Sequence, residues 1–139
     1  MTIKYPTEDK EQMDLAEYLN HRFGYFGWVH VPNQRWAKVQ YLRKLAKMGV
    51  KKGFPDILIF ERATYRDEVI NGVFYHGKDI GDFRFVGMAI ELKRQKGAKP
   101  ITSREQNNWL KALEQKGWAA VVAYGVQDAI NKIEEVYVK

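Results

Sequence analysis

The spacing of apolar residues along the chain changes between two periods, one typical of helices and one typical of strands. The helical period, with cap residues at its ends, predicts helices at about residues 8–22, 35–48, 103–117 and 127–135. Runs of β-branched and aromatic residues predict strands at about residues 25–31, 57–60, 86–93 and 118–124. Because strands alternate with helices, we expect an α/β domain with three layers, in which helices flank a mixed sheet. It is expected to be a single domain, covering residues 1–139.

The segment from about residue 62 to 86 interrupts this alternation. It mixes charged and aromatic residues around Asn71-Gly72, which lies between Val69-Ile70 and Val73-Phe74-Tyr75. An Asn-Gly pair between two such runs predicts a tight β-hairpin. We therefore interpret this segment as an inserted hairpin.

The apolar stripe of the first helix continues into polar residues. Thr7 can cap this helix and Gly24 can end it. Counting back by helical steps from Leu19 and Leu15 leads to Gln12 and then to Glu8, whereas Glu11 falls to the side of the stripe. Glu8 and Gln12 are therefore expected to face the core, and the alternative is an exposed first turn.

The second helix combines a predicted apolar stripe with strong positive charge. Trp36, Val39, Leu42 and Ala46 form the stripe, and Gly49 ends the helix. The segment from 35 to 52 contains no acidic residue. It contains seven basic ones: Arg35, Lys38, Arg43, Lys44, Lys47, Lys51 and Lys52. They form either a solvated helix face or a binding site for phosphates.

Charged residues stand where the strand patterns predict core. Asp56 directly precedes the apolar run Ile57–Phe60, and Glu91 lies between Ile90 and Leu92. Lys93 shares the face of Glu91 because strand side chains alternate. Burial of two carboxylates is costly unless a partner such as Mg²⁺ or Mn²⁺ joins them, and the lysine beside them can stabilise charge on a phosphoryl group. This arrangement is typical of PD-(D/E)xK nucleases, which hydrolyse phosphodiester bonds.

Each of these residues also has a plainer interpretation. Asp56 can accept backbone amides in a turn, and Glu91 with Lys93 can form an ion pair on an edge strand. Gln106 can act only as the capping partner of Ser103. The histidines, His21, His30 and His76, lack the spacing of metal ligands.

Composition excludes several other kinds of protein. The chain has no cysteine, so disulfides, thiolate nucleophiles and cysteine-based metal sites are excluded. No apolar run is long enough to span a membrane, and the first residues do not resemble a secretory leader, so we expect a cytoplasmic protein. Lysine and arginine total 23 against 17 acidic residues, and the net charge of +6 favours a polyanionic partner.

The chain resembles the VRR-NUC family, a branch of the PD-(D/E)xK superfamily, from about residue 8 to 130. The resemblance is carried by Gly49–Leu58, Ala89–Lys93 and Ser103–Gln106, with Trp109, Leu113 and Gly117 following. Glu8, Gln12 and Val31–Asn33 resemble the first helix and strand of that family. The resemblance implies a restriction-endonuclease-like fold, a Mg²⁺- or Mn²⁺-dependent site, and a role in DNA replication, recombination or repair.

The family's site residues transfer to matching positions of this sequence. Asp56 and Glu91 correspond to the metal-binding carboxylates, Lys93 to the catalytic lysine and Gln106 to the active-site glutamine. Glu8 corresponds to the N-terminal acidic residue that joins the metal site, with Glu11 as the alternative.

Small stand-alone members of this family are typical of phages and bacteria and resemble homodimers that cut branched DNA. We therefore expect a homodimeric endonuclease acting on four-way junctions. The aromatic residues of the hairpin and its flanks are a candidate for part of the dimer contact, namely Tyr65, Phe74, Tyr75, Phe83 and Phe85. The alternative is an extension of the sheet folded onto its own domain. Two rival functions are a flap- or end-directed nuclease and a catalytically silent nucleic-acid-binding protein.

Overall fold

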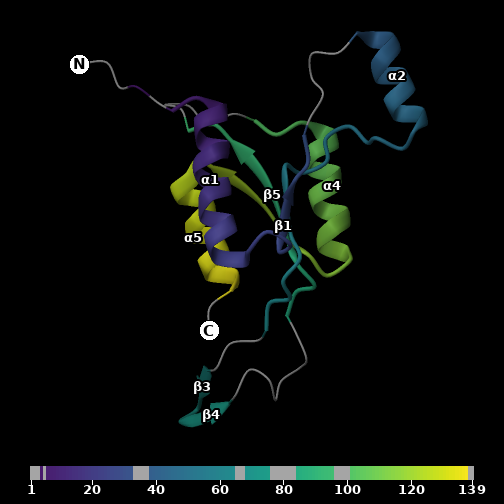
Figure 1. Ribbon diagram of the computed structural model, residues 1–139. Coiled ribbons are helices and arrows are strands. Elements are labelled where there is room, and N and C mark those ends of the chain that lie inside the picture. The colour runs from purple at the N-terminus through teal and green to yellow at the C-terminus, as the bar shows by residue number, and fades with distance from the viewer. Residues whose placement is uncertain are drawn as a thin grey trace.

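A mixed sheet of four strands forms the centre of the fold (Figure 1). The computed structural model describes residues 4, 6–32, 38–64, 68–75, 84–95 and 101–137. The strands run in the order β1 (Trp28–His30), β2 (Ile57–Ile59), β5 (Met88–Lys93) and β6 (Ala119–Tyr124). The β1–β2 and β2–β5 pairs are antiparallel, whereas β5 and β6 are parallel.

Helices cover both faces of the sheet, which gives the three layers that the sequence predicts. α1 (Glu8–Phe23) and α5 (Val126–Val136) pack together on one face, and α4 (Arg104–Gln115) packs on the other (Figure 1). The core lies mainly in the first layer, where Leu15, Leu19 and Ile133 meet Ile57 and Ile90. None of the described helices has the length and apolar content needed to cross a bilayer.

The predicted caps of two helices are present. Thr7 Oγ1 accepts a hydrogen bond from Lys10 N at 3.1 Å, and Gly24 ends α1 with φ of 79°. Ser103 and Gln106 form a complete capping box at the start of α4. These local patterns are sufficient to determine where the two helices begin.

The first strand is shorter than the sequence predicts. Residues 25–31 were expected to be extended, but β1 covers only Trp28–His30, and Tyr25 and Phe26 are exposed in the preceding turn. Among the described strands β1 lies at the edge of the sheet and pairs with β2, which offers three residues for pairing. The length of the partner therefore limits the length of β1.

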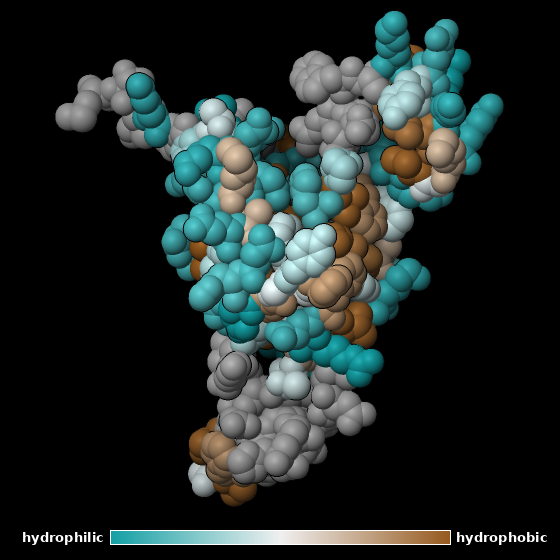
Figure 2. All heavy atoms as spheres, in the orientation of Figure 1, coloured by the Kyte–Doolittle hydropathy of each residue, from teal (hydrophilic) through white to brown (hydrophobic). Residues whose placement is uncertain are grey.

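The prediction of a buried stripe on the second helix is wrong. α2 (Val39–Lys47) has no buried residue, and Val39, Leu42 and Ala46 are exposed, while Trp36 lies outside the described residues. Figure 1 shows α2 standing away from the sheet, and Figure 2 shows apolar and polar side chains side by side on it. Amphipathic spacing predicts a helix with an apolar face, but not which element that face will meet.

The inserted hairpin is confirmed. β3 (Glu68–Ile70) pairs with β4 (Val73–Tyr75), and the turn residues Asn71 and Gly72 have φ of 51° and 78°. A bridge between Ala63 and Phe85 closes the base of the insert. The hairpin is a two-stranded sheet of its own and does not extend the central sheet. Tyr65 and Phe83 lie outside the described residues.

Replacement of Ile133 by alanine is expected to reduce the free energy of unfolding by about 2–5 kcal/mol, because Ile133 is fully buried between the helices and the sheet. Urea denaturation monitored by circular dichroism measures the change. Ile101→Ala is the matched control, since Ile101 is 93% exposed, and its effect should stay within about 0.5 kcal/mol. Equal losses for the two variants would contradict the packing of α5 against the sheet.

Candidate active site

Asp56, which directly precedes β2, and Glu91, on the neighbouring strand β5, lie at the same end of the sheet. The β2–β5 register pairs Ile57 with Ile90, so Asp56, one residue earlier, stands opposite Glu91, one residue later. Residues opposite each other in antiparallel strands project from the same face. Asp56 Oδ2 also accepts a hydrogen bond from Leu92 N at 2.8 Å, which fastens its side chain to β5. The two predicted carboxylates are therefore brought together.

Glu91, Lys93 and Gln106 form a closed polar cluster. Lys93 Nζ lies 3.5 Å from Glu91 Oε1 and donates a hydrogen bond to Gln106 Oε1 at 2.9 Å. Gln106 Nε2 donates to Glu91 Oε1 at 2.8 Å. Glu91 is only 1% exposed, and Gln106 is 6% exposed. The cluster thus gives the buried carboxylate both a cation and an amide donor, which offsets the cost of removing its charge from water.

The plainer interpretation of Glu91 and Lys93 as an edge-strand ion pair is wrong. β5 has β2 on one side and β6 on the other, so it is an interior strand. Gln106 caps α4 and also contacts the two charged residues of β5. Its backbone N–H and its side-chain oxygen take part in the capping box with Ser103, and the same side chain reaches Glu91 and Lys93.

The helical argument that favoured Glu8 over Glu11 is also wrong. Glu8 is exposed in the first turn of α1, whereas Glu11 is 2% exposed and is buried in line with Leu15 and Leu19. Glu11 precedes Leu15 by four residues and Leu19 by eight, so it can also belong to the apolar stripe, and the neighbouring elements decide between it and Glu8. The backbone N–H of Gln95 at the end of β5 donates to Glu11, and Gly125, at the start of α5, lies close to it.

Gly125 is required where it meets Glu11. Its φ of +91° strongly favours glycine, and a Cβ there would lie 3.3 Å from Glu11 Oε1 and 3.0 Å from Gln95 Cβ. Gly125 N also donates to Lys93 O at 2.9 Å. Glu11 and Gly125 therefore hold the backbone just beyond the charged end of β5.

Two residues near the site, His30 and Gly53, have no site role in the sequence prediction. His30 Nδ1 lies 3.1 Å from the backbone oxygen of Asp56, across the β1–β2 pair. Gly53, three residues before Asp56, is buried with φ of +81° and packs against Glu105 and Gln106. The sequence signal for Gly53 is its place in the segment leading to Pro55-Asp56, whereas His30 becomes a neighbour only through strand pairing.

The basic residues predicted to bind phosphates extend along α2 and the loop that follows it. Lys38, Arg43, Lys44, Lys47, Lys51 and Lys52 are all exposed, and Arg35 lies outside the described residues. Lys52 Nζ lies 3.7 Å from Glu105 Oε1 on α4, and this neighbour helps to hold the pKa of Glu105 below its usual value, after a backbone hydrogen bond as the larger cause. The loop that carries Lys51 and Lys52 continues into Asp56.

The donor atoms of the site suit a hard divalent cation. Within the described ranges, no three histidine, aspartate or glutamate side chains gather into a cluster that could enclose a metal alone. Mg²⁺ commonly uses one or two protein carboxylates and completes its coordination with water and substrate phosphate. Asp56 and Glu91 fit that pattern, since both offer carboxylate oxygens from one face of the sheet.

Comparison with known proteins gives a match to one family. The family model described as the VRR-NUC domain matches residues 7–127. A solved structure named VRR_NUC domain protein matches with a TM-score of 0.66 at 24% sequence identity, and the alignment covers 98% of this chain and 91% of that one. At this identity the likeness shows the shared fold. A search of curated proteins finds no match.

Glu11→Gln is expected to change how stability depends on pH. Burial is the main reason why the pKa of Glu11 is raised above 4.5. The folded chain then holds this proton more tightly than the unfolded chain, so the contribution of Glu11 to stability falls as pH rises through the interval above 4.5. The variant should therefore gain stability relative to wild type over that interval, as measured by urea denaturation at a series of pH values.

Glu8→Gln is the matched control for that experiment, because it removes one carboxyl group from the exposed first turn of the same helix. If Glu8→Gln changes the pH dependence of stability and Glu11→Gln does not, the burial of Glu11 would be contradicted.

Proposed function

We propose that this chain, which belongs to the VRR-NUC domain family, is a metal-dependent DNA endonuclease. Membership makes it part of a nuclease family. The observation that carries the proposal for this chain is the meeting of Asp56, Glu91 and Lys93 at one end of the sheet. These are the groups that phosphodiester hydrolysis needs, namely oxygen ligands for a cation and a fixed positive charge beside them.

Asp56 and Glu91 are the residues that would hold Mg²⁺ or Mn²⁺. Such an ion, when bound, lowers the pKa of a coordinated water and neutralises charge on the phosphoryl oxygens. Lys93 directs its ammonium group from the same face and stabilises the negative charge that develops on the phosphate during attack. Gln106 orients both Glu91 and Lys93, because its side-chain amide forms a hydrogen bond with each of them.

An acidic residue of α1 completes the proposed site. The family resemblance assigns this part to Glu8, with Glu11 as the alternative. The burial of Glu11 and its hydrogen bonds from Gln95 N, two residues beyond Lys93, support Glu11. The exposed Glu8 has no comparable support from its position in the fold.

Branched DNA, such as a four-way junction, is the proposed substrate, and a homodimer in the cytoplasm is the proposed acting form. Two copies related by a two-fold axis would present two sites to a junction of similar symmetry. The hairpin is the candidate contact, since Val69, Val73 and Phe74 are each more than half exposed and an isolated two-stranded sheet is only marginally stable.

Cleavage assays on a panel of substrates test these proposals. Duplex, flap, splayed and four-way DNA would be incubated with the protein in Mg²⁺, Mn²⁺ or EDTA. Paired nicks in opposing strands of the junction would support cleavage by a symmetric dimer. Faster cleavage of flaps or free ends would show that these, and not the junction, are the preferred substrate. DNA binding without cleavage in either metal would show that the chain is a nucleic-acid-binding protein without nuclease activity.

Asp56→Asn, Glu91→Gln and Lys93→Ala are each expected to lower the cleavage rate by on the order of a hundredfold or more, because they remove metal ligands or the fixed charge. Fluorescence anisotropy with labelled DNA should show binding largely retained. Gln106→Ala and Gln12→Ala should have milder effects. Glu114→Gln, exposed on α4, is the control that keeps full activity. Substantial cleavage by Glu91→Gln would refute the assignment.

Neutralising Lys44 and Lys47 together is expected to weaken binding to all DNA structures alike. If both lysines contact phosphates, a plot of the logarithm of the binding constant against the logarithm of the salt concentration should become shallower. Its slope should change by about 0.9 for each lost contact. Lys111→Gln with Lys116→Gln, two exposed positions at α4, removes the same charge elsewhere and serves as the control. An unchanged slope in the α2 variant would show that Lys44 and Lys47 face solvent and do not contact phosphates.

A further inference from the structure

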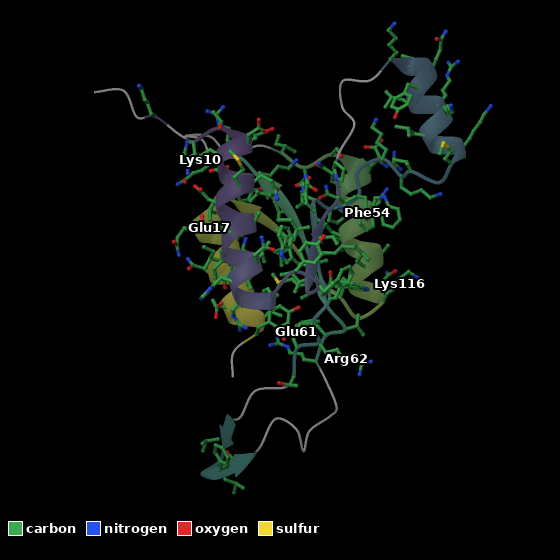
Figure 3. The ribbon with its side chains drawn as sticks, in the orientation of Figure 1. Lys10, Glu17, Phe54, Glu61, Arg62 and Lys116 are labelled. Atoms are coloured by element: carbon green, nitrogen blue, oxygen red, sulfur yellow. The ribbon has the colours of Figure 1, made fainter. Side chains whose placement is uncertain are left out.

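The chain that joins α2 to Asp56 is fastened to α4 by an aromatic side chain. Trp109 Nε1 donates a hydrogen bond to the backbone oxygen of Lys52 at 3.1 Å. The Phe54 ring meets the Trp109 ring edge to face, with centroids 5.0 Å apart. Figure 3 shows Phe54 near the start of α4, with Lys116 just past its other end. Residues 52–54 and Trp109 therefore form a contact that we call the loop clamp.

The loop clamp touches the same helical turn that carries Gln106. A Cβ on Gly53 would lie 2.7 Å from Glu105 Cβ and 2.9 Å from Gln106 N, so only glycine lets the loop approach this closely. Pro55, the next buried residue, leads directly into Asp56. The first turns of α4 thus contact both halves of the site, through Gln106 on the β5 side and through Trp109 on the Asp56 side.

The loop clamp also limits where α2 can lie. Lys52 in the clamp lies five positions after Lys47, the end of α2, and five steps of extended chain span at most about 18 Å. Among the described residues α2 buries none of its own side chains. The fixed loop is therefore the structural connection between the basic helix and the carboxylate at Asp56.

We propose that Trp109 is a positioning residue that makes DNA binding by α2 contribute to the rate of cleavage. This inference rests on the proposed nuclease function. Binding energy gained away from the reacting bond raises the rate only when a rigid connection carries it to the reacting groups. Trp109 supplies that rigidity because it holds the Lys52 backbone and the Phe54 ring in place.

The first test compares two tryptophan variants with wild type in Mg²⁺ or Mn²⁺. Trp109→Phe keeps a ring against Phe54 but loses the indole hydrogen bond, and its kcat should fall about fivefold, the factor that one hydrogen bond commonly represents. Trp109→Ala loses both contacts, and its kcat should fall on the order of a hundredfold, as expected when reacting groups are misplaced. The Kd for DNA, measured in EDTA, should change little in both.

Trp28→Phe is the matched control. It loses a similar indole hydrogen bond, from Trp28 Nε1 to Asn20 Oδ1 at 2.8 Å, at the opposite end of the β1–β2 pair. Its kcat should equal that of wild type. Thermal unfolding of all variants identifies any loss that is due to stability alone, and Trp109→Phe keeps the test valid if Trp109→Ala does not fold.

The second test asks whether α2 acts through the clamp. In wild type, replacing Lys44 and Lys47 by glutamine should weaken binding and also lower kcat. In the Trp109→Ala background, or Trp109→Phe if needed, the same change should weaken binding but leave kcat nearly unaltered, so that the two effects on kcat are not additive. Additive effects, or a normal kcat in Trp109→Phe, would overturn the inference. If wild type cuts no DNA, the proposed function fails instead.

Discussion

Burial of the Glu91 carboxylate inside the sheet is the constraint that shapes the rest of the site. A primary amide is suited to it because one end donates hydrogen bonds and the other end accepts them. Gln106 presents its nitrogen to Glu91 and its oxygen to Lys93 and Ser103 N. Rotating this amide by half a turn would put oxygen against carboxylate and NH₂ against ammonium. The charges on β5 therefore dictate a single orientation of Gln106.

Much of the scaffold follows from local sequence signals. Thr7 and Ser103 cap the helices that they were expected to cap, and Asn71-Gly72 makes the expected turn. The proximity of Asp56 and Glu91 was also predictable, since one precedes and the other interrupts an apolar strand pattern, where a charge needs a specific reason. These features depend on hydrogen bonds and periodicities that span only a few neighbouring residues.

The features that the sequence did not predict depend on distant neighbours. Glu11 is buried because the ends of β5 and β6 converge on it, and the exposed face of α2 reflects the lack of a partner among the described elements. β1 ends where β2 stops offering pairing partners. Gly53 and His30 gain their surroundings only through the packing of α4 and the pairing of β1 with β2.

The parallel pairing of β5 and β6 has a consequence for the chirality of the site. Parallel neighbours need a crossover connection, and about 98% of such connections between parallel strands are right-handed. α4 lies within this crossover, so handedness confines it to one side of the sheet. Moving Glu91 by one position along β5 would turn its carboxylate towards the apolar layer of Leu15 and Ile133. The handedness of the crossover thus determines which face of β5 can carry charged residues, namely the face that α4 covers.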